Sequence, residues 1–97
     1  MELSIKAIHF DITEKLTAFV NKKVEKFCRR NEMVSDIDVN LRLIKPETAM
    51  NKEAGIRVIV ADAPEFYASK TADTFEEAVD LALAALEPQL EKFKSRK

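Results

Sequence analysis

The chain has 97 residues, of which 46% are hydrophobic and 34% are charged, with one glycine and three prolines. This length predicts one domain over residues 1–97, and the composition is typical of a compact globular protein rather than of a disordered chain. A single cysteine excludes an internal disulfide. Neither a signal peptide nor an apolar run of about 18 residues is evident, so we expect a cytoplasmic protein with no membrane partner.

The net charge of −1 hides a strong segregation of charge along the chain. Residues 12–30 contain six basic and two acidic side chains, a balance of +4. Residues 73–91 contain six acids and no base, a balance of −6, whereas residues 92–97 contain four bases and no acid. Segregation of this kind says more about binding partners than the total charge does.

The first 30 residues predict a strand followed by a helix. Apolar residues alternate within residues 1–10, as on one face of a strand. Thr13 is placed to cap a helix that we expect to end near Arg30. The apolar stripe of this helix recurs at helical spacing and consists of Leu16, Val20, Val24 and Phe27.

The middle of the chain predicts three strands. Residues 36–44 alternate between apolar and polar, and residues 55–62 repeat the pattern. A polar, mobile connection is expected between them over residues 45–55. Residues 65–70 predict the next strand, after a turn.

A second helix is predicted from about Phe75 to Phe93. Thr74 precedes Glu77 by three residues, which is the spacing of a capping box. Pro88 lies inside this helix and lacks an amide donor, so it predicts either a bend or a helix end at Glu87. We favour the bend because helical spacing continues across the proline in Leu86, Leu90 and Phe93.

The resulting order is β-α-β-β-β-α. It predicts an α+β fold, a four-stranded sheet with two roughly parallel helices packed on one face, similar to a double-stranded-RNA-binding domain. The right-handed crossover rule makes the first two strands parallel. Both helices then run in the same direction, so their C-terminal ends, and the two basic segments, should lie side by side.

Few residues are suited to catalysis or to metal binding. His9 is the only histidine and lies far in sequence from Cys28, so a nucleophilic Cys–His pair is not indicated. Glu76, Glu77 and Asp80 lie in the first turns of the second helix and predict a solvated face rather than acid–base chemistry. We therefore expect no enzyme activity, no cofactor, no metal and no small-molecule substrate.

The basic residues are better candidates for function. Four of them fall within about 60° on a helical wheel of the first helix, namely Lys15, Lys22, Lys26 and Arg29. Arg30 lies further round this helix, toward the core side. A solvated face is the simpler interpretation of one helix, but convergence with the terminal basic segment favours phosphate binding that is salt-sensitive and independent of base sequence. Tyr67, on the outer face of the last strand, is interpreted as a cross-strand contact rather than a base-stacking residue.

Two long segments resemble a known family. "IKAIHFDITEKLTAFVNKKVEKF" and "TFEEAVDLALAALEPQLEKFKSR" are similar to the ribosome hibernation promoting factor family, also called ribosome-associated inhibitor A, in its short form. The resemblance implies a non-enzymatic protein that binds the small ribosomal subunit in the channel of messenger and transfer RNA, in stress or stationary phase. The positions that match the closing helix of the family are Asp80, Leu86, Gln89, Leu90, Lys92, Phe93 and Lys94.

The same resemblance implies which residues contact ribosomal RNA. The residues carried over are Lys22, Lys23, Lys26, Lys92 and Lys94. Charge placement adds Arg29, Arg30, Arg96 and Lys97. The chain departs from the family at three positions that are often basic there, namely Ala85, Pro88 and Glu91.

Two alternatives remain open. One is a protein-interaction module without RNA binding, a weak homodimer formed through sheet edges or through the acidic half of the second helix. The other is a ferredoxin-like ligand-binding or enzymatic domain. That fold has a further strand after the second helix, which we do not expect here because the sequence stops at Lys97. A bound cofactor or a titrating pocket around His9 would favour this alternative.

Overall fold

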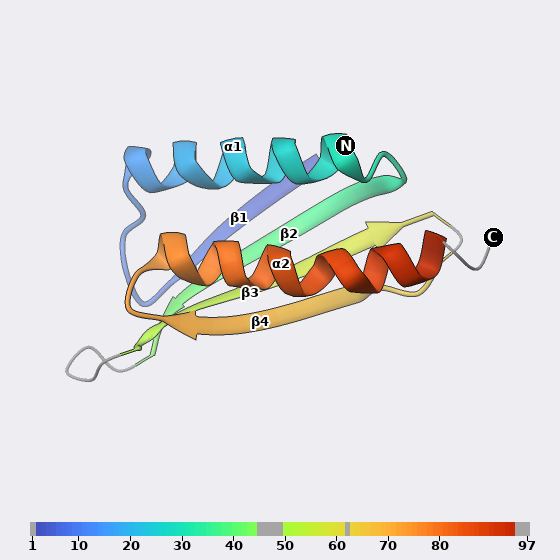
Figure 1. The fold of residues 1–97 in the computed structure, drawn as a ribbon. Coiled ribbons are helices and arrows are strands. Elements are labelled where there is room, and N and C mark those ends of the chain that lie inside the picture. Colours follow the sequence, from blue (N-terminus) through green and yellow to red (C-terminus); the bar gives the residue numbers. More distant parts are fainter. Residues whose placement is uncertain (1, 45–49, 62, 95–97) are drawn as a thin grey trace.

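The computed structural model describes residues 2–44, 50–61 and 63–94. The elements follow the order predicted from the sequence (Figure 1). They are β1 (Glu2–Ile8), α1 (Glu14–Arg30), β2 (Val34–Leu43), β3 (Lys52–Val60), β4 (Phe66–Ala72) and α2 (Phe75–Lys94).

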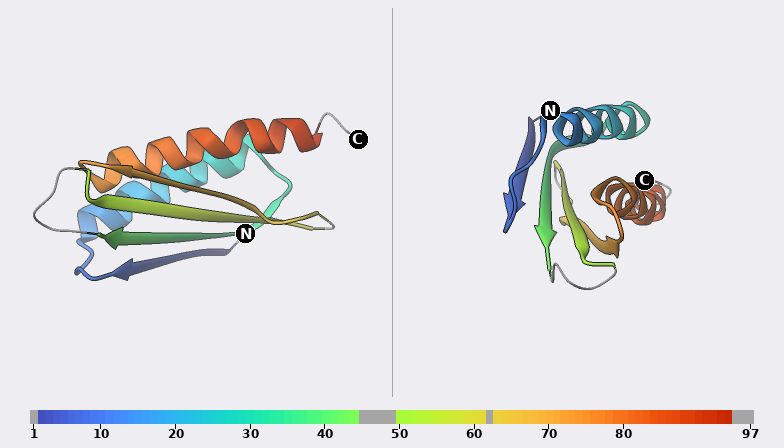
Figure 2. Two further views of the ribbon diagram at one scale, coloured as in Figure 1. Left: turned by 90° about the horizontal axis from the view of Figure 1, so that it is seen from below. Right: turned by 90° about the vertical axis from the view of Figure 1, so that its left-hand side faces the viewer.

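The four strands form one sheet in the spatial order β1-β2-β3-β4. β1 pairs parallel with β2, as the crossover rule predicted, and the other two pairs are antiparallel. Both helices cover the same face of the sheet, and the opposite face is uncovered (Figure 2). The α+β prediction is therefore confirmed.

The start of β3 corrects one sequence-based expectation. The polar connection was expected to extend to residue 55, but β3 begins at Lys52 and pairs with β2 from there. Lys52 lies opposite Leu43 of β2 and also opposite Ala72 of β4, so hydrogen-bonded neighbours on both sides extend the strand into a polar stretch. Residues 45–49 of the expected mobile connection lie outside the described residues.

The core lies between the helices and the covered face of the sheet. The predicted α1 stripe is buried, with Val20 and Val24 completely inaccessible. From the sheet, Ile37, Leu41 and Ile56 are equally inaccessible, and each such side chain contributes about 1.5–3 kcal/mol through burial. The residues that α2 buries are Phe75, Ala78, Val79, Ala82, Leu83, Leu86 and Leu90.

Both predicted helix starts are capped. Thr13 Oγ1 accepts a hydrogen bond from the Leu16 amide at 3.1 Å, and Thr74 Oγ1 accepts one from the Glu77 amide at 3.1 Å. Each cap is worth about 1 kcal/mol. The caps fix where both helices begin, at the same end of the molecule (Figure 1).

Helix α2 continues through Pro88 as far as Lys94, so the proline does not end the helix at Glu87. Ala84, whose carbonyl loses its partner, is exposed, as is Pro88. Because that carbonyl can bond to water, the proline is tolerated here more easily than it would be in a buried turn. The bend itself stays a prediction. No helix within the described residues is long and apolar enough to cross a membrane.

Candidate nucleic-acid interface

The C-terminal ends of the two helices meet. Both helices run in the same direction (Figure 1), and Lys94 Nζ donates a hydrogen bond to the Arg30 carbonyl oxygen at 3.1 Å. This contact joins residues that are 64 positions apart in sequence. The predicted convergence of the two basic segments is thus confirmed for their described parts, while Arg96 and Lys97 lie outside the described residues.

The end of α1 is held by a buried asparagine. Asn31 is only 2% exposed, its side-chain amide donates to the Phe27 carbonyl at 2.9 Å, and its backbone amide donates to the Cys28 carbonyl at 3.2 Å. These bonds satisfy carbonyls that the helix end would otherwise leave without partners. Arg29 and Arg30 lie in this last turn, where cations complement the negative end of the helix dipole.

Part of the predicted basic surface is open to solvent. Lys22, Lys26 and Arg29 are exposed, and no ion pair among the described residues involves them. On α2, Lys92 and Lys94 are exposed in the last turn. Five of the predicted RNA-binding side chains are therefore accessible, three of them in the last turns of the two helices and two, Lys22 and Lys26, further back along α1.

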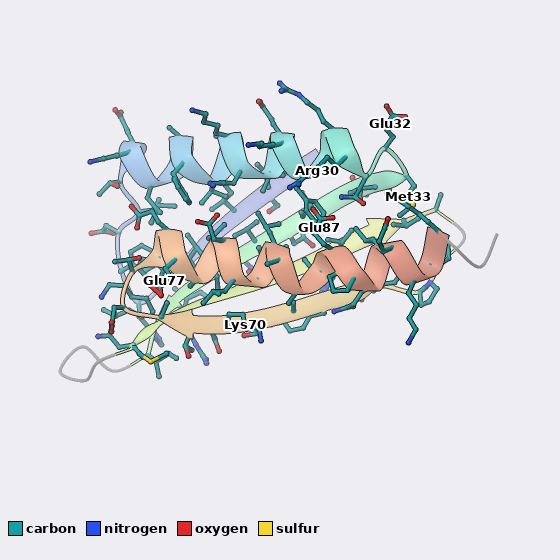
Figure 3. The ribbon with its side chains drawn as sticks, viewed as in Figure 1. Arg30, Glu32, Met33, Lys70, Glu77 and Glu87 are labelled. Carbon is teal, nitrogen blue, oxygen red and sulfur yellow. The ribbon has the colours of Figure 1, made fainter. Side chains whose placement is uncertain are left out.

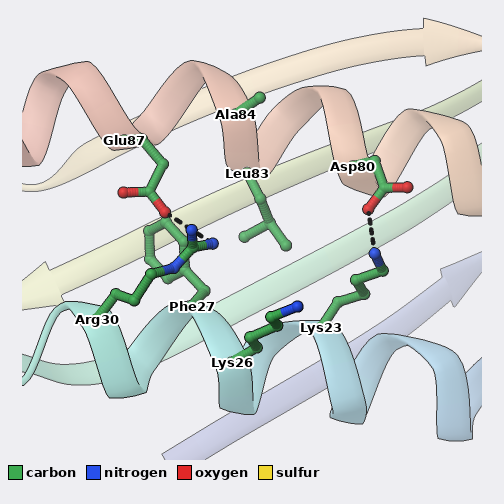
Figure 4. A pocket seen from close by; sticks show the side chains of 8 residues that line it. All are labelled: Lys23, Lys26, Phe27, Arg30, Asp80, Leu83, Ala84 and Glu87. Atoms are coloured by element: carbon green, nitrogen blue, oxygen red, sulfur yellow. Dashed lines mark ion pairs between the residues drawn. The ribbon is translucent and has the colours of Figure 1, made fainter.

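Two other predicted residues face a groove between the helices (Figure 4). Lys23 Nζ lies 3.2 Å from Asp80 Oδ1, and Arg30 Nη2 lies 3.3 Å from Glu87 Oε1. Lys26 lines the same groove, which has a volume of about 290 Å³. Three cations from α1 thus face two carboxylates from α2.

The two ion pairs differ in their surroundings. Lys23 also lies 5.5 Å from the centroid of the Phe19 ring, close enough for a cation–π contact. Glu87 Oε1 is buried and has no hydrogen-bond partner among the described residues. Arg30 and Glu87 point toward each other across the gap between the helices (Figure 3), so this contact is one of charge without hydrogen-bond alignment.

Sequence reasoning missed these pairs although a signal for them exists. Lys23 and Arg30 are seven residues apart on α1, and Asp80 and Glu87 are seven residues apart on α2. Seven residues make about two helical turns, so equal spacings on two parallel helices place both pairs in register. The acid-rich half of α2 had been interpreted as a solvated face or, in the alternative function, as a dimer contact.

The three positions at which the chain differs from the resembled family are not equally exposed. Ala85 packs against the core, whereas Pro88 and Glu91 are exposed. Basic residues at 88 and 91 would therefore have extended the accessible basic surface along α2. In this chain the α2 contribution to a cationic surface begins at Lys92.

The residues considered for catalysis do not form a site. His9 is exposed in the turn after β1, with a φ of 69°, in the left-handed region. Burial raises the pKa of the Cys28 thiol, which disfavours the reactive thiolate. The described part of the chain contains no group of three or more His, Cys, Asp or Glu residues that could hold a metal ion.

Tyr67 makes the cross-strand contact that was favoured from the sequence. Its Oη lies 2.5 Å from where a Cβ on Gly55 would be, so the ring tip lies over the only glycine of the chain. The residue is nevertheless 53% exposed.

Comparisons with known proteins agree with this architecture. The family model described as "Sigma 54 modulation protein / S30EA ribosomal protein" matches residues 3–97. A ribosomal subunit interface protein from Coxiella burnetii has a similar structure, with a TM-score of 0.85 and 23% identity, over 98% of this chain and 99% of that one. The N-terminal domain of Protein Y from Thermus thermophilus has a TM-score of 0.77 and 21% identity, over 96% of this chain and 99% of that one. No curated protein matches the chain.

Proposed function

Because the chain belongs to the family of sigma 54 modulation protein and S30EA ribosomal protein, whose members associate with ribosomes and are not enzymes, we propose that it is a translation inhibitor. It binds ribosomal RNA of the small subunit in the channel used by messenger and transfer RNA. It acts in the cytoplasm, in stress or stationary phase, when ribosomes are idle.

The observation that carries this proposal is the meeting of the two helix ends. The Lys94–Arg30 contact brings basic residues from both ends of the sequence to one end of the molecule. Lys22, Lys26 and Arg29 add exposed charge along α1. A cationic surface assembled from two segments, on a chain with a net charge of −1, favours contact with a phosphate backbone over a merely solvated helix.

Contacts of this kind have a defined salt dependence. Each phosphate neutralised by a lysine or arginine releases counterions, so the logarithm of the binding constant falls linearly with the logarithm of the salt concentration. The slope changes by about 0.7–0.9 for each contact. Ribosome sedimentation across a salt series therefore tests the partner and the mechanism together.

Charge reversal on α1 provides the decisive variant. We expect Lys22→Glu combined with Lys26→Glu to weaken co-sedimentation with small subunits and to lower the salt slope by about 1.5. Adding Lys92→Glu should abolish binding without unfolding the domain. Lys52→Glu combined with Lys70→Glu is the matched control, because it makes the same change in charge on β3 and β4.

The proposal fails if the wild-type chain does not sediment with ribosomes from stationary cells at low salt. Equal losses of ribosome binding in the α1 variant and in its control would also contradict the proposal, because binding would then depend only on the net charge of the chain. A stable dimer in light scattering, together with no ribosome binding, would favour the protein-interaction module. β1 and β4, as the outer strands of the sheet, each leave one edge open for such pairing.

A further inference from the structure

The uncovered face of the sheet carries an aromatic ring in an unusual setting. Tyr67 Oη, Cζ and Cε1 lie 2.5, 3.3 and 3.6 Å from where a Cβ on Gly55 would be. Gly55 is not the residue opposite Tyr67, since Arg57 holds that position. The ring therefore leans diagonally across β3, with its tip on the backbone of Gly55, and at 53% exposure it leaves much of its surface open.

An open hollow of about 360 Å³ lies beside this ring. It is lined by Tyr67 and Gly55 with Ile8, Asn40, Arg42 and Glu53. The volume falls at the lower end of the range of small-ligand sites, about 300–1,000 Å³. The hollow thus combines an aromatic platform, an apolar side chain and an amide that can both donate and accept hydrogen bonds.

Two cations lie at or beside the hollow. Arg42 lines it, and Lys6 lies in register with Asn40 on the same face of the sheet. The carboxylate of Glu53 is already engaged, 3.1 Å from Arg42 Nη2 and 3.3 Å from Ser69 Oγ, which donates to it. The acid in the hollow is therefore partly neutralised, and an exposed pair of this kind gives up its partner at little cost.

We propose that this hollow binds an unpaired nucleobase of single-stranded RNA, stacked on Tyr67. The base edge faces Asn40, and the adjoining phosphates contact Lys6 and Arg42. Stacking on an aromatic side chain and hydrogen bonding to base edges are the usual means by which proteins hold unpaired RNA bases. The site lies on the face opposite the helices, so it adds a second RNA contact to the helix-end surface.

The choice of RNA as the ligand rests on the proposed function, and the chemistry of the face supports it. Within the strands of the described structure, Tyr67 is the one exposed large hydrophobic side chain, since Ile44, Met50 and Leu81 lie outside them. A stable protein interface needs about 800 Å² on each partner around an apolar core. A single ring with polar neighbours fits a base better than it fits such a core.

The chain offers a direct probe of this site. Tyr67 is its only tyrosine, and it has no tryptophan, so intrinsic emission reports on the ring itself. We expect a short single-stranded oligoadenylate to quench Tyr67 emission with saturation, after correction with free tyrosinamide. Inorganic polyphosphate, which has the charge without the base, should leave the emission unchanged.

Substitutions then separate stacking from charge. Tyr67→Ala should weaken oligoadenylate binding by about 5- to 150-fold, in line with the loss of one stacked base. Tyr67→Phe, which keeps the ring, should stay close to the wild type. Gly55→Ala, which places a Cβ against the tyrosine hydroxyl, should displace the ring and weaken binding while the domain stays folded by circular dichroism.

The proposal is overturned if polyphosphate quenches as strongly as oligoadenylate, or if Tyr67→Ala binds oligoadenylate as well as the wild type does. A Tyr67→Ala effect confined to self-association in light scattering would overturn it in favour of a protein contact. The test is independent of ribosome sedimentation. Quenching that persists while ribosomes fail to bind would contradict the proposed function alone, and normal sedimentation without quenching would contradict the stacking site alone.

Discussion

Under the proposed function, the ion pairs in the groove between the helices predict that this chain restrains its own affinity for RNA. Asp80 and Glu87 hold Lys23 and Arg30, two of the candidate RNA-binding residues. The double variant Asp80→Asn and Glu87→Gln removes both negative charges while keeping the size of the side chains. We expect it to bind small ribosomal subunits more tightly than the wild type does.

The magnitude follows from the exposure of the four side chains. They are 33–65% exposed, so each pair contributes only about 0.2–1 kcal/mol to the folded state. A lysine or arginine that leaves its acid to bind a phosphate loses the free energy of the ion pair. Removing the acid therefore removes this cost from RNA binding. The expected gain is about 1.4- to 5-fold for each pair, or about 2- to 30-fold for both.

The stability of the double variant should change little. Loss of two exposed pairs costs at most about 2 kcal/mol. The cost at Glu87 should be the smaller one, because its buried Oε1 has no hydrogen bond to lose. Thermal unfolding, measured beside the binding experiment, separates a gain in affinity from a change in folding.

Co-sedimentation across a salt series is the assay, and α2 supplies a matched control. Glu76→Gln combined with Glu77→Gln removes the same number of charges from the first turn of this helix, at the opposite end of α2 from Lys92 and Lys94. Its affinity gain should be smaller, because neither glutamate forms an ion pair with a candidate RNA-binding residue within the described structure. An equal gain in both variants, or no gain in the groove variant, would refute the reasoning.

Two further predictions concern single residues. The raised pKa of Cys28 means that the folded state disfavours the thiolate; its stabilising contribution is therefore complete below the ordinary thiol pKa of about 8.5 and is lost as the pH rises above it. Urea unfolding at neutral and alkaline pH should show this loss in the wild type, and a Cys28→Ala variant with the same pH dependence would contradict it. Pro88→Ala restores the amide donor facing the Ala84 carbonyl, and we expect the free energy of unfolding to rise by up to about 3 kcal/mol. An unchanged urea midpoint would show that Pro88 is accommodated without strain.

Local signals were enough to predict most of the fold. Alternation and helical spacing identified the buried faces, and the threonines at 13 and 74 marked both helix starts, because capping depends on residues only three positions apart. Chain direction and the crossover rule then predicted that the helix ends meet. The start of β3 was missed because Lys52 joins the strand through pairing with β2 and β4, which its own polar neighbourhood does not indicate.

The candidate site was predicted only in outline for a related reason. Which residues of α1 are basic can be read from the chain, but which of them face solvent depends on how far the two helices are rotated and shifted against each other. That placement turns Lys23 and Arg30 toward Asp80 and Glu87, and leaves Lys22 and Arg29 outside the groove. The sheet hollow depends on a contact between Tyr67 and Gly55 across two strands, which likewise needs the register.

A net charge of −1 does not oppose binding to a polyanion when charge is distributed in this way. The acids at the start of α2 lie about 24 Å along the helix from Lys92, at about 1.5 Å per residue, which is about three screening lengths at physiological salt. Near the basic end, residues 22–32 contain five bases and two acids, and residues 87–94 contain two of each, a local balance of +3. Glu87 is already paired with Arg30. An approaching phosphate therefore meets the electrostatic field of the local excess of cations rather than that of the total charge of the chain.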